Sequence, residues 1–220
     1  MPKATRGRAT LVVAAASLAV LPIAATASAN TGDHRTEKYR ADLRPVPHAS
    51  SADSGSNVTG QVKLKLRGDN ALQVRLKARR TSANLPHAVH IHGKDNPEVA
   101  QCPGADRRDD LVDDGLIETA EGLGDYGPVL ISFTTTGDTS ADSLLALDRF
   151  PVASDSGRLR YKRTFDIPTD LAGRLDDFHV VVHGEDLNHD GMYGGRTTAL
   201  GAPLEAELPV ACGELHRRGH

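Results

Sequence analysis

Two short segments place histidines where their side chains could bind a transition metal. Residues 86–93 read PHAVHIHG, and residues 178–184 read FHVVVHG. On a β-strand, side chains two positions apart point to the same face, so His90 and His92 project together. If the strand that ends at His183 lies nearby, His90, His92 and His183 form a three-nitrogen site of a kind that suits copper or zinc. The alternative is a set of hydrogen-bonded histidines that hold no metal.

A second metal hypothesis concerns residues 186–191, which read DLNHDG. Asp186, Asn188 and Asp190 match the first half of a calcium-binding loop, in which alternate oxygens face one ion. The acidic residue that would complete an EF-hand loop falls at Thr197, so the match is incomplete. A polar turn built from Asp, Asn and Gly is the alternative. Acidic residues between 106 and 121 are expected to form a solvated loop, and a carboxylate cation site is the alternative there.

These residues need strands to position them, and the chain is rich in alternating apolar and polar runs. The runs at 58–67 and 72–79 flank a Gly-Asp-Asn turn and predict a hairpin. Further strands are expected at residues 88–92, 129–135, 159–167, 178–183 and 204–210. Helix is expected only at 140–147 and as a single turn at 170–175. The GxGxxG segment at 122–127 precedes a strand, so it is interpreted as a flexible turn and not as a dinucleotide site. Many short strands predict an all-β sandwich or barrel.

The N-terminus is typical of a secretory signal peptide. Lys3, Arg6 and Arg8 precede a small apolar run that ends in Ala-Ser-Ala at residues 27–29. We therefore expect a signal peptide at 1–29, a disordered mature start at 30–37, one β domain at 38–215 and a C-terminal tail at 216–220. The protein is expected to be secreted, extracellular or in the cell envelope, with no membrane association after cleavage. Its alanine-, arginine- and aspartate-rich composition suggests a bacterial source.

Charge and cysteine content narrow the function classes. The chain carries a formal net charge of -3, and loss of the signal peptide makes it more acidic. Short pairs such as Arg79-Arg80 do not predict the concentrated basic face that nucleic-acid binding needs, so no nucleic-acid partner is expected. In an exported protein, the two cysteines Cys102 and Cys212 favour one disulfide over two unpaired thiols. The identity of a protein partner stays open.

Taken together, these motifs resemble the Cu/Zn superoxide dismutase superfamily. The matching features are HxxHxH followed by Gly, a cysteine ten residues later, a late VVVH and an ACG near the C-terminus. The resemblance implies a Greek-key β-sandwich or flattened barrel with long loops. It also implies copper ligands at His90, His92 and His183 and a Cys102–Cys212 disulfide, with His87 and His179 beside the ligands. Residues 39–92 also resemble bacterial chordin-type (CHRD) domains.

The departures from this superfamily bear on activity. No histidine lies between His92 and His179, so the bridging and zinc histidines have no counterpart and no zinc is expected. The arginine that guides superoxide corresponds to Pro209. Because these parts are missing, the resemblance predicts a secreted copper-binding protein and argues against dismutase activity. If the protein is an enzyme, it is a superoxide dismutase-like oxidoreductase. The alternative is a non-catalytic extracellular binding or structural domain, stabilised by calcium at the DLNHDG loop.

Overall fold

The alternating runs form long antiparallel strands. The structure is a computed structural model that describes residues 1, 35–49, 57–95, 100–108 and 110–219. Strands β2 (Thr59–Arg67) and β3 (Ala71–Arg79) form the predicted hairpin, with Gly68 at positive φ in its turn. In β2, Val62, Leu64 and Leu66 are buried while the intervening side chains face outward. The period of two in the sequence therefore becomes one apolar face and one polar face.

The described strands join into a single antiparallel sheet in the order β5-β4-β7-β8-β1-β2-β3-β6, with β9 paired to β1. The remaining strand bounds are β1 (Thr36–Pro45), β4 (Val89–His92), β5 (Val129–Ser132), β6 (Arg158–Asp166), β7 (His179–His183), β8 (Pro209–Glu214) and β9 (His216–Arg218). The chain crosses the sheet between β3 and β4 and again between β6 and β7, which is a Greek-key feature. The expected all-β class is confirmed.

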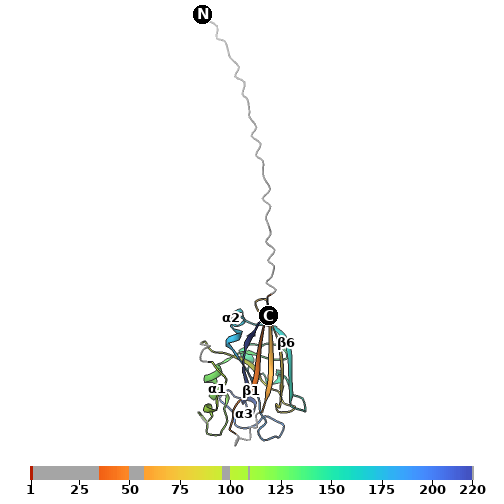
Figure 1. Cartoon of the computed structure of the whole chain (residues 1–220), viewed down its shortest axis with the longest axis vertical. Helices are drawn as coiled ribbons and strands as arrows, with labels where there is room; N and C mark the ends of the chain where they lie inside the picture. The colour runs from red at the N-terminus through yellow and green to blue at the C-terminus, as the bar shows by residue number, and fades with distance from the viewer. Residues whose placement is uncertain (2–34, 50–56, 96–99, 109, 220) are drawn as a thin grey trace. The chain divides into compact units, whose positions relative to one another are not determined.

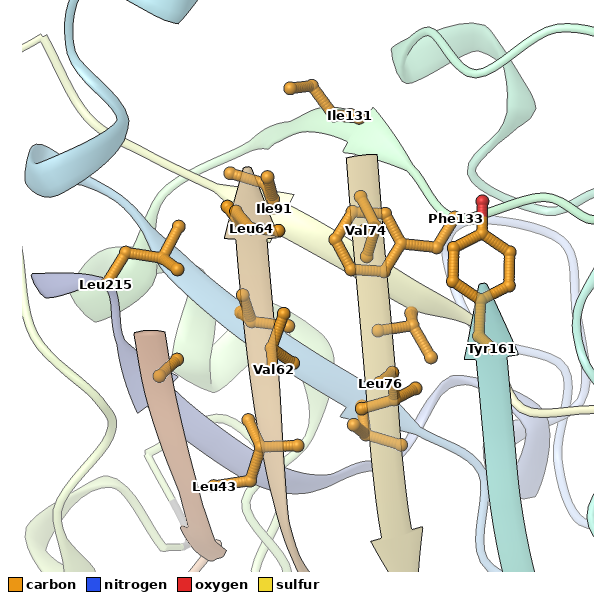
Figure 2. Close-up of a cluster of buried hydrophobic side chains, with 14 of the residues drawn as sticks. Leu43, Val62, Leu64, Val74, Leu76, Ile91, Ile131, Phe133, Tyr161 and Leu215 are labelled. Atoms are coloured by element: carbon orange, nitrogen blue, oxygen red, sulfur yellow. The ribbon is translucent and has the colours of Figure 1, made fainter. Parts of the chain in front are cut away.

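The sheet curls into a half-barrel around its apolar face (Figure 1). Figure 2 shows side chains from β2 and β3, such as Leu64 and Val74, facing Ile91 of β4 across the interior. At the open side of the curl, the Phe133 and Tyr161 rings stack with centroids 5.5 Å apart. The Tyr161 hydroxyl also donates to the Thr134 carbonyl at 2.9 Å. Side chains, rather than a further strand pairing, thus link the two ends of the described sheet.

Helical segments are short and lie in the loops. They are the 3₁₀ turns η2 (Ala105–Arg107), η3 (Ala141–Ser143), η4 (Leu147–Arg149) and η5 (Leu175–Asp177), and the helices α1 (Thr119–Tyr126), α2 (Thr169–Ala172) and α3 (Leu204–Glu207). Within the described residues, no helix is long and apolar enough to span a membrane. The predicted signal peptide at 1–29 lies outside the described residues.

Several local predictions were wrong. The 140–147 helix is instead the 3₁₀ turn η3 followed by irregular chain and the start of η4, and the 204–210 strand begins as α3. The predicted flexible turn at 122–127 lies largely in α1, the longest described helix. A capping box between Glu118 and Glu121 starts α1 despite two glycines that weaken it. In addition, β1 begins within the expected disordered start, and β9 lies in the expected tail.

The Cys102–Cys212 disulfide ties β8 to the long loop before α1. The two cysteines are 110 residues apart and bonded, as predicted. Closing a loop of that length removes conformational entropy from the unfolded chain, worth about 4 to 5 kcal/mol as an upper figure.

We therefore expect the double substitution Cys102→Ala/Cys212→Ala to lower the free energy of unfolding by up to about 4 kcal/mol. Urea unfolding with and without reductant measures the effect. Reductant should destabilise the wild type and leave the double variant unchanged. A variant as stable as the oxidised wild type contradicts the expectation.

His48 holds the same loop to the sheet from inside. Its Nδ1 accepts from the Ile117 amide, and its Nε2–H donates to the Pro209 carbonyl, each at 2.9 Å. Burial lowers the pKa of His48, as does nearby Arg108, while the Pro209 carbonyl, Asp114 and Glu121 act in the opposite direction. The neutral ring is therefore the form that fits this position.

Since the unfolded-state pKa of His48 is about 6.5 and the folded value lies lower, stability should fall as the pH drops below about 6.5. We expect His48→Gln to reduce the loss of stability between pH 7.5 and pH 5.5, measured by urea unfolding. His216→Gln, at an exposed histidine, is the control and should leave that loss unchanged. A wild-type pH dependence in His48→Gln overturns the assignment.

Candidate metal centre

The candidate site lies on the outer face of β4 and β7, opposite the core. These strands pair with His90 opposite Val181 and His92 opposite His179, and directly opposite residues share a face. The alternate residues, such as Ile91 and Val180, belong to the core cluster. Both faces of β4 and β7 are nonetheless buried, because long loops cover the outer one. The histidines are therefore enclosed between sheet and loops.

The structure brings three of the predicted histidines together. One ring nitrogen from each of His90, His92 and His183 lies within 4.8 Å of the other two. The ring centroids are 5.2 to 5.6 Å apart. Among the described residues, this is the one cluster of three or more potential ligands with such spacing. Three imidazoles thus converge on one point.

Hydrogen bonds from the loops fix two of these rings. His92 donates from Nδ1 to the Gly127 carbonyl at 2.8 Å, and His183 donates from Nδ1 to the Glu207 carbonyl at 2.7 Å. A proton on Nδ1 leaves Nε2 as the atom with a free lone pair. The Nε2 atoms of both rings are buried without a hydrogen-bond partner. Both histidines are thereby held in a form that can coordinate a metal.

His90 is held by packing. Its ring meets the Phe150 ring edge-on, with centroids 5.3 Å apart. Neither ring nitrogen of His90 has a conventional hydrogen bond, although both are buried. A buried polar atom without a partner costs about 1–3 kcal/mol. Unpartnered nitrogens that converge in this way are arranged as metal ligands would be. In a closed hydrogen-bond network, each of them would have a partner.

Burial keeps all three rings neutral. Desolvation lowers the pKa of His92 to about 3 and that of His183 to about 4. Burial also lowers the pKa of His90 well below its usual range, reinforced by repulsion from His183 and His92 and opposed in part by the main chain of Leu144. Neutral imidazole is the form that ligates metals. The residues present therefore fit a metal ion that imidazole nitrogens can ligate.

Access to the histidines is narrow and largely apolar. A cavity of about 40 Å³ borders the three rings, and the leucines 144, 145, 147 and 200 form much of its wall. Its lining contains an acidic residue, Glu207, and no lysine or arginine. Such a cavity does not attract an anion from solution by charge.

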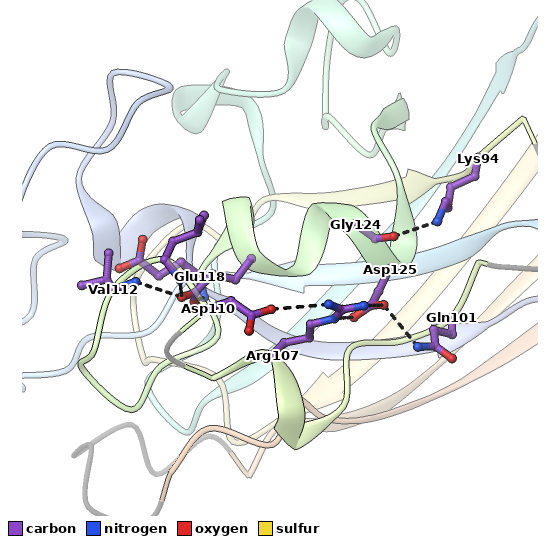
Figure 3. Close-up of polar contacts among 10 residues, drawn as sticks. Lys94, Gln101, Arg107, Asp110, Val112, Glu118, Gly124 and Asp125 are labelled. Atoms are coloured by element: carbon purple, nitrogen blue, oxygen red, sulfur yellow. Dashed lines mark hydrogen bonds and ion pairs between the residues drawn. The ribbon is translucent and has the colours of Figure 1, made fainter.

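Helix α1 positions the carbonyl that holds His92. Figure 3 shows its C-terminal end fixed by ion pairing and hydrogen bonding: Arg107 pairs with Asp125 at 2.8 Å, and Gln101 donates to the same carboxylate. Lys94 donates to the Gly124 carbonyl at 2.7 Å. Tyr126 packs against the His92 ring with centroids 4.6 Å apart. The loop that carries the disulfide therefore also sets the His92 ring.

A second contact between loops supports His183. The Thr119 hydroxyl donates to the Glu207 carbonyl that accepts from His183. An ion pair between Glu118 and Arg196 joins the same two loops. These contacts thus join α1 to the segment around α3, and the two segments together cover the histidines.

The other predicted residues have different roles. His87 lies with Nδ1 3.0 Å from the His183 carbonyl and Nε2 3.0 Å from the Ser82 carbonyl, so it contacts the backbone of a ligand and not its ring. His179 is buried on the same face as the cluster but outside it. Its Nε2 lies 3.9 Å from the Glu214 carboxylate.

The DLNHDG segment folds on itself. Asp186 accepts from the amides of Asp190 and Gly191, and the Asn188 side chain donates to Asp190. In the described part of the chain, Asp186 and Asp190 belong to no cluster of three or more His, Cys, Asp or Glu residues with ligand spacing. The polar-turn alternative accounts for these contacts.

Sequence reasoning missed the groups that orient the rings. Gly127 and Glu207 act through main-chain carbonyls, which no side-chain pattern reveals. Phe150 follows a 3₁₀ turn far from either histidine motif. Gly127 itself is the one local sign that the sequence offers of a constrained position here. It ends α1 just before a strand, and its φ of 80° disfavours other residues.

Of three comparisons with known proteins, only the one with solved structures found matches. No protein-family model matches the sequence, and no curated protein matches it. Among solved structures, a glutamate-to-glutamine mutant of Candida albicans superoxide dismutase 5 aligns with 13% identity and a TM-score of 0.32. The alignment covers 84% of this chain and 95% of that one. A TM-score this low supports no conclusion about the site.

The role of Gly127 can be tested with a matched glycine. In Gly127→Ala, the new Cβ would lie 2.3 Å from the Gly93 carbonyl at a backbone φ of 80°. We expect a loss of about 1 kcal/mol or more in unfolding free energy and a displaced acceptor for His92.

The control is Gly124→Ala in the same helix, where an added Cβ meets nothing within 4 Å. This change should leave stability unchanged or raise it by up to about 1 kcal/mol. Urea unfolding measures both. Equal stabilities for the two variants contradict the proposed constraint at Gly127.

Proposed function

We propose that this is an exported copper-binding protein that holds the metal through His90, His92 and His183. The observation that carries the proposal is the convergence of three buried, neutral imidazoles, two of them hydrogen-bonded through Nδ1 so that Nε2 is left to coordinate. Imidazole ligands suit copper, which also stands above zinc in the order of divalent-metal affinities. When bound, copper would supply one-electron redox chemistry at this point.

The surroundings of the site support binding more than dismutation. Superoxide is an anion, and fast enzymes of this type steer their substrate with positive charge. Here the cavity lining contains Glu207 and several leucines but no cation. No histidine between His92 and His179 could bridge to a second metal. We therefore propose that the protein binds and retains copper in an apolar site and does not catalyse the dismutation of superoxide.

Export is supported by the disulfide and by the N-terminal sequence. A disulfide persists in oxidising compartments, and the charged start, apolar run and Ala-Ser-Ala of residues 1–29 have the order of a signal peptide.

The second candidate function is a non-catalytic extracellular domain whose histidines are structural. It is supported by the main-chain carbonyls of Gly127 and Glu207, because hydrogen bonds of this kind hold buried structural histidines in place. The two functions differ in one measurable property, which is the affinity of the histidine cluster for copper.

The test is copper titration of the purified protein by calorimetry, with elemental analysis after dialysis. We expect one copper per chain, and His92→Gln should weaken binding about 100-fold or more, since even outer partners of metal-bound histidines contribute 10–100-fold. His216→Gln, at an exposed histidine outside the cluster, is the control and should bind as the wild type does.

Circular dichroism shows whether His92→Gln remains folded, and His183→Asn provides a second ligand variant. Electron paramagnetic resonance of the copper-loaded protein should show coupling to three nitrogens, and this coupling pattern should change in both ligand variants. A folded wild type that retains no copper, or a His92→Gln variant that binds as tightly as His216→Gln, overturns the proposal. A superoxide assay on the copper-loaded protein should show no activity above that of the metal-free protein.

A further inference from the structure

The outer face of β1, β2, β3 and β6 is densely basic. Counting every second residue, the outward side chains include Lys38 and Arg40 of β1, Lys63, Lys65 and Arg67 of β2, Arg75, Lys77 and Arg79 of β3, and Arg158, Arg160 and Lys162 of β6. On the same strands, Asp42 and Asp166 are the acidic residues that face outward. We call this surface the basic face. Like the histidine cluster it lies outside the core, but on different strands of the curled sheet.

The basic face was not expected, since runs such as Arg79-Arg80 are too short to form one. It arises from register. Arg40 pairs with Lys63, Lys63 with Arg75, and Arg75 with Lys162, which places four cations side by side across four strands. Neighbouring strands lie about 4.8 Å apart. The sheet therefore concentrates charges that are distant in the sequence.

This arrangement costs stability. Like charges directly opposite each other on neighbouring strands are destabilising. Within the described residues, Arg40 pairs with Asp42, whereas Lys63, Arg75 and Lys162 form no ion pair. The chain as a whole has a net charge of -3, so the cations are concentrated here and not distributed evenly. A bound anion would offset the repulsion.

The basic side chains line three neighbouring hollows, which together we call the track. One hollow of about 390 Å³ is lined by Lys38, Arg40, Lys63, Lys65, Arg75 and Arg218. A second, of about 450 Å³, is lined by Arg75, Lys77, Arg160 and Lys162. A third, of about 310 Å³, is lined by Gln61, Lys77 and Arg79. Arg75 lines both of the first two hollows and Lys77 both of the last two, so the three hollows are neighbours on the face.

The side chains that line the track favour some kinds of polyanion over others. No aromatic side chain faces outward from these four strands, since Tyr39 and Tyr161 are buried and Phe165 packs against the core. Without aromatic side chains there is no platform for stacked bases and no anchor for a bilayer. Gln73 lines the first hollow and Gln61 the third. Their amides can hydrogen-bond to hydroxyl groups between charges.

We propose that the basic face binds a linear anionic polysaccharide, a sugar polymer that carries carboxylate or sulfate groups along its length. The neighbouring hollows suit a linear chain, the lysines and arginines suit its charges, and the glutamines suit its hydroxyls. The proposal does not depend on copper binding, because the basic face shares no residue with the histidine cluster.

The test measures binding of the purified protein to polygalacturonate and to dextran sulfate, with neutral dextran as the uncharged polymer. We expect binding to the two anionic polymers, an affinity that falls steeply with added salt, and a rise in the thermal unfolding midpoint when the polymer is present. Arg75→Gln/Lys77→Gln, which removes the cations shared between hollows, should weaken binding about tenfold, equivalent to about 1.4 kcal/mol.

The control is Arg35→Gln/Arg80→Gln, which makes the same change in net charge at exposed residues before β1 and after β3 that line none of the three hollows. It should bind as the wild type does. Equal weakening in both variants shows a net-charge effect and overturns the proposal, as does absence of binding by the wild type. Tighter binding to phosphatidylglycerol vesicles or to single-stranded poly-dT than to either polysaccharide overturns the choice of partner.

Discussion

The pairing of β4 with β7 is the constraint on which the rest of the site depends. Its register sets His90 opposite Val181 and His92 opposite His179, so one face of the pair carries imidazoles and the other carries the aliphatic core. A shift by one residue would move every side chain to the other face. Burying Val180 and Val182 in the core therefore also fixes the direction of the histidines, and the long loops then have a defined surface to cover.

The sheet and the loops contribute different parts of the site. The sheet sets where the rings point, while the loops decide which nitrogen carries the proton, through the carbonyls of Gly127 and Glu207. The loops have little regular structure, and their order depends on the disulfide, on the Arg107–Asp125 pair and on the Glu118–Arg196 pair. Cross-links of this kind are what allow irregular chain to hold a ring with the accuracy that coordination requires.

The sequence predicted features that depend on local spacing and missed those that depend on register. The period of two in HIH and in VKLKL was enough to predict faces, strands and the hairpin. It could not reveal that the Gly127 carbonyl meets His92, because a main-chain acceptor has no residue type. It could not reveal the basic face either, since Lys63, Arg75 and Lys162 become neighbours only through strand pairing. Helix α1 was missed because its glycines disfavour a helix that its capping box and the surrounding loop stabilise.

Both proposed sites follow from groups that folding alone does not explain. At the histidine cluster, buried nitrogens lack hydrogen-bond partners, each at a cost of about 1–3 kcal/mol. On the basic face, cations lie directly opposite cations without carboxylates between them. A sequence optimised only for stability would replace the buried imidazoles with aliphatic residues and alternate the sign of the surface charges. Each exception would be relieved by one kind of ligand, a metal cation outside β4 and β7 and a polyanion outside β1, β2, β3 and β6. Because the core separates the two faces, each ligand can be removed experimentally without disturbing the contacts that would bind the other.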